Sequence, residues 1–567
     1  MPDVRHDDFG TARRHAPTWS GVQGALVGLL VTALALGVAE LAAALWQVPG
    51  PVVLVGDAVV DLSPATLTAW SMDQLGEYQK PVLLSGILGM LALSAPVLGA
   101  AALNRPWVGY VGLLGFAVVG AIAVLVQPAH GPTALAALAS GTGAGAVGLG
   151  VLLHQARRTR AAGESLAVSP SPSPGPGQAG PGSGTSDASD SLGRRVEEET
   201  GAAAEPAGAC AAVPARRGFL IAGAGVLGTA VTTAGIGRWL AGATGAAAAR
   251  EQLRLPAPQQ PLPPLPGSAD LDIPGLAPFR TPNTDFYRID TALRVPRVPP
   301  QQWVLRVHGM VDRPLQLSFD DILRRDLTEA DTTLTCVSNE INGDLVGNTR
   351  WLGVDLAEIL REAGVAASAD QILSTSTDGW TCGTPTEVVL DGRNALLAIG
   401  MAGEPLPLRH GFPARMVVPG IYGFVGATKW VTDIKLTRFA DEQAYWAQRG
   451  WAVRAPIKTM CRIDVPGAFA EVPAGETIVA GVAWAQRRGI DGVEVRVDGG
   501  AWRQAELAEV PGVDTWRQWV AELPLDPGGH TIEARATDGA GDTQTGDRTD
   551  PIPDGATGWP SIRITAS

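Results

Sequence analysis

Long uninterrupted runs of apolar residues dominate the first part of the chain. Four of them cover about 21–46, 82–103, 107–127 and 133–153, and each reaches the roughly 20 residues with which a helix crosses a bilayer. The first run carries Glu40, and an ionisable residue in such a segment is a functional candidate by default. Glycines in the fourth run favour close helix packing. The pattern predicts a transmembrane region of four helices over residues 1–160.

Positive charges around these runs predict their orientation. The flanking arginines are Arg5, Arg13 and Arg14 before the first run, Arg105 between the second and third, and Arg157, Arg158 and Arg160 after the fourth. Because arginines collect on the cytoplasmic side of membrane proteins, both the N-terminus and the segment after the fourth helix are expected in the cytoplasm.

A change of composition follows at residues 161–214, which are rich in Ser, Pro, Gly and Ala and are expected to form a flexible linker. Arg216 and Arg217 then precede Phe219 and a fifth apolar run, within a segment placed at 215–245. Paired arginines before such a run resemble a twin-arginine export signal, and an ordinary membrane anchor is the alternative. Either would carry the rest of the chain outward. The small residues at 241–249 would permit cleavage.

The remaining chain has the pattern of soluble domains. After a Pro-rich spacer at 246–273, short apolar runs alternate with helical stretches such as Leu356–Ala363, which predicts an α+β domain over 274–440. From 441 to 567, strands of period two are separated by Gly-rich turns, which predicts an all-β immunoglobulin-like sandwich. The expected fold class is therefore multi-domain: a helical membrane bundle, an α+β domain and a β-sandwich.

The net charge and the cysteine spacing argue against several classes of function. The net charge of −13 disfavours nucleic-acid binding. The four cysteines, at 210, 336, 382 and 461, show no CxxC spacing. This argues against a disulfide framework, a structural zinc site and covalently attached haem.

One cysteine stands where chemistry is expected. Cys336 ends the apolar run Thr333-Leu-Thr and begins a polar loop containing Asn339. Taken alone, a buried structural cysteine is the more common reading. The loop is followed by Gly347-Asn-Thr-Arg350-Trp351 and a short helix, and in this order the stretch resembles the molybdenum domain of sulfite oxidases and their relatives. The resemblance implies that Cys336 is the thiolate ligand of molybdenum in a molybdenum–molybdopterin (pyranopterin) cofactor, because a soft thiolate suits such a metal.

A second stretch strengthens the resemblance. Gly403-Glu-Pro-Leu-Pro-Leu-Arg-His410-Gly-Phe-Pro-Ala-Arg415-Met-Val-Val-Pro419-Gly runs on to Thr428-Lys429-Trp430 and follows the family pattern closely. By resemblance His410, Arg415, Thr428 and Lys429 hold the pterin and its phosphate, and Arg350 and Tyr422 join Cys336 as catalytic residues. A weaker match at 281–290 adds Thr284, Tyr287 and Arg288 to the cofactor-binding residues, with an aromatic pair in an edge strand as the alternative.

The chain departs from sulfite oxidases where the substrate is expected. Glu340 and Ile341 follow Asn339 in place of two arginines, Ile399 replaces a tyrosine, and Arg288 stands one place early. A carboxylate repels an anion, so sulfite is expected to be a poor substrate and a neutral one is favoured.

These features predict an extracytoplasmic molybdopterin-dependent oxidoreductase in a multi-pass membrane protein, transferring an oxygen atom on a small substrate. The alternatives are an S- or N-oxide reductase of the same family and a membrane-tethered binding module without activity. The membrane bundle offers only His130 and His154 near its helices, both close to helix ends, which disfavours a pair of histidines that binds haem within the membrane. A separate electron-transfer partner is therefore expected. The C-terminal domain resembles a dimerisation domain, and a homodimer is expected through it.

Overall fold

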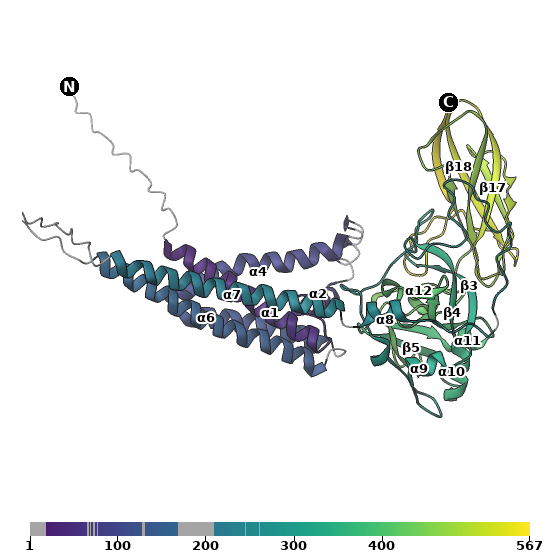
Figure 1. Cartoon of the computed structure of the whole chain (residues 1–567). Helices are drawn as coiled ribbons and strands as arrows, with labels where there is room; N and C mark the ends of the chain where they lie inside the picture. The colour runs from purple at the N-terminus through teal and green to yellow at the C-terminus, as the bar shows by residue number, and fades with distance from the viewer. Residues whose placement is uncertain are drawn as a thin grey trace, which may run out of the picture. The chain divides into compact units, whose positions relative to one another are not determined.

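The computed structural model describes residues 19–567 apart from 65–66, 68–69, 72–73, 76–77, 128–130, 168–208, 244 and 260. The chain divides into two compact units. One consists of helices from the first 241 residues, and the other contains Gly242–Ser567 with two short earlier segments (Figure 1).

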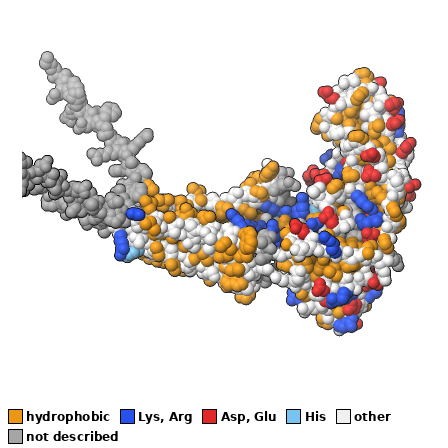
Figure 2. Space-filling view, in the orientation of Figure 1, with side chains coloured by type: hydrophobic (Ala, Val, Ile, Leu, Met, Phe, Trp, Pro, Cys, Tyr) orange, Lys and Arg blue, Asp and Glu red, His pale blue; other side chains and the backbone are white. Residues whose placement is uncertain are grey.

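The first unit is a set of long apolar helices. They are α1 (Trp19–Leu45), α2 (Pro51–Leu62), α4 (Gln79–Asn104), α5 (Pro106–Val126), α6 (Gly131–Ala167) and α7 (Ala209–Ala243). Among the described residues, all but α2 are long and apolar enough to cross a membrane. Met90, Leu93 and Val97 of α4 are 72%, 77% and 68% exposed, as expected of a lipid-facing surface, and apolar side chains cover much of this unit (Figure 2). The five apolar runs of the sequence are thus confirmed as helices consistent with membrane association.

Small residues let these helices approach closely. A Cβ on Gly141 of α6 would lie 2.4 Å from the carbonyl oxygen of Ala35 in α1, and one on Gly28 would lie 1.8 Å from that of Ala95 in α4. Packing therefore explains the glycines of the fourth run. Two boundaries differ from the prediction. Helix α2 occupies part of an expected connection, and α6 and α7 extend into both ends of the expected linker, whose middle lies outside the described residues.

The second unit begins with an α+β domain built on two sheets. The first sheet has the order β2 (Leu315–Ser318), β1 (Val304–Gly309), β10 (Val431–Thr437), β5 (Gln371–Ser376) and β6 (Thr381–Pro385). Only β1 and β10 are parallel in this sheet. The second sheet is antiparallel, with the order β3 (Thr328–Thr335), β4 (Val346–Asp355), β7 (Leu396–Met401) and β8 (Glu404–Pro405), and β9 (Arg415–Val417) pairs with β7.

Short helices connect and cover the strands of this domain. They are α8 (Ala246–Gln252), α9 (Phe319–Leu323), α10 (Leu356–Ala363), α11 (Thr386–Leu390) and α12 (Gly423–Gly426), with 3-10 turns η3 (Pro300–Gln302), η4 (Leu408–His410) and η5 (Ala447–Arg449). Helix α10 matches its predicted bounds because both ends are encoded locally. The Asp355 carboxylate accepts from the Ala357 N–H, and Gly364 ends the helix in the left-handed conformation.

The segment expected as a Pro-rich spacer instead packs on the α+β domain. Ala246 is buried among Trp351 and Phe412, and the Arg250 guanidinium contacts the Leu406 carbonyl at 2.9 Å and the Glu404 carboxylate at 2.6 Å. The apolar side chains of Leu253 and Leu255 join the core. The described residues between 246 and 266 therefore pack on the domain and do not form a free spacer.

The C-terminal region consists of two β-sheets around one core. One sheet has the order β11 (Met460–Val465), β13 (Gly475–Trp484), β17 (Arg517–Leu525) and β16 (Glu506–Leu507), and the other β12 (Glu471–Val472), β19 (Ser561–Ala566), β18 (Gly528–Asp538), β14 (Ile490–Val497) and β15 (Arg503–Gln504). Val479 and Trp519 from the first sheet meet Val493 and Ile532 from the second, so apolar alternation along the strands buries one face of each sheet.

Candidate functional site

Cys336 follows the last residue of β3 and is held by a closed loop. Its N–H donates to the Leu345 carbonyl at 2.9 Å, and its carbonyl accepts from the Asn339 N–H at 3.1 Å. The Asn339 side chain in turn accepts from the Leu345 N–H at 2.9 Å. The thiol is buried, with 9% of the residue exposed. Burial raises its pKa, and hydrogen bonds from Ser338 and the charge of Lys429 partly oppose that rise.

Three basic side chains gather near this thiol. Arg415 in β9 is 5% exposed, and burial lowers its pKa to about 10. Burial also lowers the pKa of Lys429 to about 8, against the favourable charge of Asp290. His410 in η4 donates one hydrogen bond, from Nε2–H to the Asn283 carbonyl at 3.0 Å. Burial, with the charge of Arg415, lowers the pKa of His410 to about 3, so this imidazole is neutral near pH 7.

The positive charges of Lys429 and Arg415 are not compensated to the same extent. The ammonium of Lys429 lies 2.8 Å from the carboxylate of Asp290, which the guanidinium of Arg288 also contacts at 2.7 Å. In contrast, the Arg415 guanidinium meets only backbone carbonyls, those of Met416, His410 and Ala427, at 3.2–3.4 Å. One carboxylate thus serves two cations, and Arg415 has no acidic partner among the described residues, so this buried region carries excess positive charge.

Aromatic rings form one wall of the site. The Phe286 ring stacks on Tyr287 at 5.3 Å and meets His410 edge-on at 5.7 Å and Trp351 at 5.9 Å. The Arg415 guanidinium lies 5.0 Å from the centre of the Trp351 ring, a cation–π distance. A Cβ on Gly347 would meet the Phe286 ring at 2.8 Å. The glycine of the Gly347-Asn-Thr-Arg-Trp351 stretch therefore makes room for Phe286.

Both predicted tyrosines lie close to Cys336. The charge of Cys336 raises the pKa of Tyr287 and of Tyr422, although burial is the larger cause in each case. Tyr422 precedes α12 and is 3% exposed. Cys336, Tyr287, Tyr422, His410, Arg415 and Lys429 are therefore brought together, with Arg288 connected through Asp290.

Other predicted residues have contacts elsewhere. Arg350 makes a two-pronged ion pair with Asp331, its register partner on β3, at 2.6 and 2.9 Å. The other contacts of the Arg350 guanidinium are with the Glu329 carboxylate and the carbonyls of Leu262 and Pro263, away from Cys336. Thr428 is fully buried, with its hydroxyl 2.7 Å from that of Ser374, and Thr284 is exposed. These contacts support a structural role for Arg350 and Thr428.

The C-terminal region supplies supports that local sequence patterns missed. The side-chain amide of Gln486 donates to the Thr333 carbonyl at 2.9 Å, and the Trp516 N–H donates to the Thr333 hydroxyl at 2.7 Å. Arg462 donates to the carbonyl of Gly343, in the loop after Cys336, at 3.3 Å. The position of Cys336 therefore depends on residues more than a hundred positions later in the chain. Among the residues that the sequence analysis missed, only Asp290 had a local signal, because this acidic residue stands two positions after the predicted cofactor-binding residue Arg288.

These residues fit the anionic cofactor that the resemblance implies. A buried guanidinium without a carboxylate is costly unless an anion accompanies it, and a phosphate is a strong bidentate partner for arginine. Among the described residues, no group of three or more His, Cys, Asp and Glu side chains could hold a metal ion. A metal at Cys336 would therefore need further ligands from outside the chain, which the dithiolene of a molybdopterin provides.

Comparisons with known proteins identify the domain that contains most of these residues. The model of the oxidoreductase molybdopterin binding domain matches residues 292–446. The uncharacterized oxidoreductase YuiH of Bacillus subtilis is 34% identical over 153 residues, which cover 27% of this chain and 74% of that protein. Mouse mitochondrial sulfite oxidase is 29% identical over 309 residues, covering 46% of this chain and 56% of that enzyme, so the chain spans about half the length of this relative.

Among solved structures, the sulfane dehydrogenase SoxCD from Paracoccus pantotrophus covers 47% of this chain and 74% of its own, at 24% identity and a TM-score of 0.42. The YuiH match spans most of that relative, and the family model falls on the domain that holds Cys336. The chain therefore belongs to the oxidoreductases with a molybdopterin-binding domain and is a sulfite oxidase-like, molybdenum-cofactor-dependent enzyme.

Proposed function

We propose that this chain is a membrane-anchored oxidoreductase that transfers an oxygen atom to or from a small uncharged substrate on the outer side of the membrane. The observation that carries the proposal is the buried Arg415 guanidinium without an acidic partner, gathered with Lys429 and His410 near the Cys336 thiol. When bound, the molybdenum cofactor supplies two-electron redox chemistry and an exchangeable oxygen atom.

The chain's own residues bind and orient in this proposal. Cys336 offers its thiolate to the metal, and Arg415 and Lys429 neutralise the anionic group. Neutral His410 is held by the Asn283 carbonyl and by the edge of Phe286. Because burial raises the pKa of Tyr287 and Tyr422, both hydroxyls keep their protons at neutral pH and can donate hydrogen bonds to a substrate oxygen.

The charges around the loop favour a substrate without negative charge. Glu340 is exposed in the loop after Cys336, and the acidic charge of Asp554 acts on Tyr422. Two cations that could bind an oxyanion already have partners, Arg288 with Asp290 and Arg350 with Asp331. An S- or N-oxide, from which the enzyme would remove the oxygen atom, is therefore a better candidate than sulfite, and oxidation of a neutral molecule is the alternative direction.

The proposal also includes the side of the membrane on which the soluble domains lie and the proteins with which they interact. The arginine distribution orients the helices so that the domains after α7 lie outside, with Arg216 and Arg217 as a twin-arginine signal. The two-sheet C-terminal region would be an immunoglobulin-like domain that pairs two copies of the chain. A separate protein would exchange electrons with the cofactor.

Metal analysis and substrate screening test the proposal. The full chain, purified with its membrane helices, should contain about one molybdenum per chain and reduce sulfoxides or N-oxides with an artificial electron donor. A protein that carries molybdenum but turns over only sulfite would contradict the substrate class. A protein that never acquires molybdenum, when expressed with the cofactor pathway, would contradict the site.

A further inference from the structure

A long connection joins β18 to β19 in the C-terminal region. It spans residues 539–560 and contains no helix or strand. It closes on itself, because Thr549 and Thr557 exchange backbone hydrogen bonds at 3.0 and 3.4 Å. Irregular connections of more than about 12–15 residues are uncommon in compact domains and are usually functional. The residues that the tip of this connection contacts therefore indicate its role.

The tip is held by the segment that leads from the α+β domain to β11. The Ala452 N–H donates to the Pro553 carbonyl at 3.0 Å. The Lys458 ammonium donates to the Asp554 carboxylate at 2.9 Å and to the Gly555 carbonyl at 2.5 Å. A hydrogen bond from a charged donor is stronger than one between neutral groups, so Lys458 fixes the backbone at Gly555.

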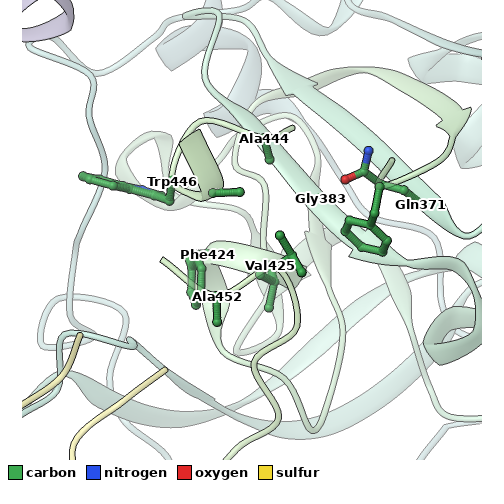
Figure 3. A pocket seen from close by; sticks show the side chains of 10 residues that line it. Gln371, Gly383, Phe424, Val425, Ala444, Trp446 and Ala452 are labelled. Carbon is green, nitrogen blue, oxygen red and sulfur yellow. The ribbon is translucent and has the colours of Figure 1, made fainter. Parts of the chain in front are cut away.

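The same segment holds the backbone around Tyr422. The Tyr422 N–H donates to the Ala455 carbonyl at 3.0 Å. Helix α12, which follows Tyr422, packs on this segment as well, since its residue Phe424 lines a small apolar pocket together with Ala452 (Figure 3). Tyr422 and the tip of the connection are thus fixed against one short stretch of chain.

Gly555 lies directly against the Tyr422 hydroxyl. A Cβ on Gly555 would lie 2.5 Å from the hydroxyl oxygen and 2.7 Å from the ring carbon that bears it, which is closer than atoms can approach. Gly555 also has a φ of +102°, which favours glycine. Tyr422 is 3% exposed, so its ring has little room to move away. The hydroxyl can therefore occupy its place only because residue 555 is a glycine.

The connection also reaches the loop after Cys336. A Cβ on Gly558 would lie 2.6 Å from Cδ1 of Ile341, and the Gly558 carbonyl accepts from the side-chain amide of Gln544 at 2.7 Å. One connection of the C-terminal region thus contacts both Tyr422 and the loop that begins with Cys336.

We propose that Gly555 is a positioning residue of the candidate site and acts through the Tyr422 hydroxyl. The absent side chain leaves the hydroxyl its place, and Lys458 keeps the Gly555 backbone against it. The inference rests on the proposed function for one point, the hydrogen bond that Tyr422 donates to the substrate oxygen. The C-terminal region then takes part in catalysis, because it sets the position of that donor.

Fluorine NMR on the full chain in lipid nanodiscs tests the contact without turnover. The chain has five tyrosines, so labelling with fluorotyrosine gives few resonances, and Tyr422→Phe assigns that of Tyr422. Gly555→Ala should shift this resonance. Gly541→Ala is the matched control, at a glycine of the same connection with a φ of +88° and open space at its Cβ position, and should leave the resonance in place. An unshifted Tyr422 resonance in Gly555→Ala would overturn the inference.

A second variant covers the case in which Gly555→Ala folds poorly. Lys458→Met removes the hydrogen bond to the Gly555 carbonyl and introduces no backbone strain at residue 555. It should also shift the Tyr422 resonance, and an unshifted resonance in this variant would show that the Lys458 contact does not hold the connection against Tyr422.

Kinetics with a neutral sulfoxide connect the contact to catalysis. At equal molybdenum content, Gly555→Ala should lower kcat/KM by roughly 10- to 100-fold, as expected when a donor is displaced, and Gly541→Ala should not. In the Tyr422→Phe background, Gly555→Ala should cause no further loss, and an equal further loss there would overturn action through Tyr422. If Gly555→Ala shifts the resonance but Tyr422→Phe turns over normally, the positioning of Tyr422 stands and its role in the proposed function fails.

Discussion

The ammonium of Lys429 lies 2.8 Å from the carboxylate of Asp290, and this pairing leaves Arg415 as the uncompensated charge of the site. Asp290 also serves Arg288, so it cannot balance a third cation. An anionic cofactor beside Cys336 would therefore interact most strongly with Arg415, and the residue roles proposed above can be separated by experiment.

Removing the thiol should abolish catalysis without unfolding the protein. Cys336→Ala deletes one buried sulfur, which should cost roughly 1–2 kcal/mol of stability. If Cys336 is the protein's ligand to molybdenum, turnover should fall to background and the metal's absorption spectrum should change. Cys382→Ala, at another buried cysteine of the same domain, is the matched control and should keep both. Normal turnover by Cys336→Ala would refute the ligand assignment.

Much of this site could be predicted from the sequence, because its basic residues and Cys336 stand in local motifs. Helix α10 and the five long apolar helices could be predicted from local apolar patterns. The partners of those residues could not be predicted. Asp331 reaches Arg350 through strand register, and Gln486 reaches Thr333 across 153 positions. Such pairings depend on tertiary packing, which local propensity does not encode.

Replacing Arg415 should separate folding from cofactor binding. In cofactor-free protein Arg415→Met removes a buried charge without an acidic partner, so stability should be unchanged or higher by about 1–2 kcal/mol. The same change should sharply lower molybdenum content. Arg350→Met is the contrast: it leaves the buried Asp331 carboxylate short of its main partner and should cost about 3 kcal/mol. Thermal unfolding of both cofactor-free variants measures the change in stability, and metal analysis of both measures the molybdenum content. A large loss of cofactor-free stability in Arg415→Met would argue that the residue is structural.

The burial of His410 predicts that the folding stability of the protein depends on pH. Its folded pKa of about 3 lies below the unfolded value near 6.5, so the unfolded chain binds the extra proton between these values. Stability from keeping His410 neutral is therefore fully present above about pH 6.5 and is lost as the pH falls towards 3. His410→Gln should flatten the pH dependence of cofactor-free unfolding in this window by a few kcal/mol, roughly 3–5. An unchanged slope, or an imidazole that titrates normally by NMR, would contradict the burial argument.

The paired arginines predict the export route. Reporter fusions after about residue 160 should report a cytoplasmic location, and fusions after about residue 260 an external one. Changing both Arg216 and Arg217 to lysine keeps the charge and should block export if the twin-arginine route is used. Normal export of that variant would leave an ordinary anchor, and a cytoplasmic C-terminal reporter in the unaltered chain would overturn the orientation itself.

Sulfite should be a poor substrate, and the charge of the loop after Cys336 should be one cause. Each charge-assisted hydrogen bond to an oxyanion contributes about 1.5–3 kcal/mol, so the absence of two arginines from this loop could weaken sulfite capture by roughly 3–6 kcal/mol. Glu340 is exposed in the same loop and adds repulsion. Glu340→Arg should therefore raise kcat/KM for sulfite, with most of the gain lost at high salt because an exposed charge is screened. The rate with a neutral sulfoxide should change little. Glu506→Arg, an equal charge change at an exposed residue of the C-terminal region, controls for net charge. Efficient turnover of micromolar sulfite by the unaltered protein would show that another cation, such as Arg288 released from Asp290, binds the oxyanion.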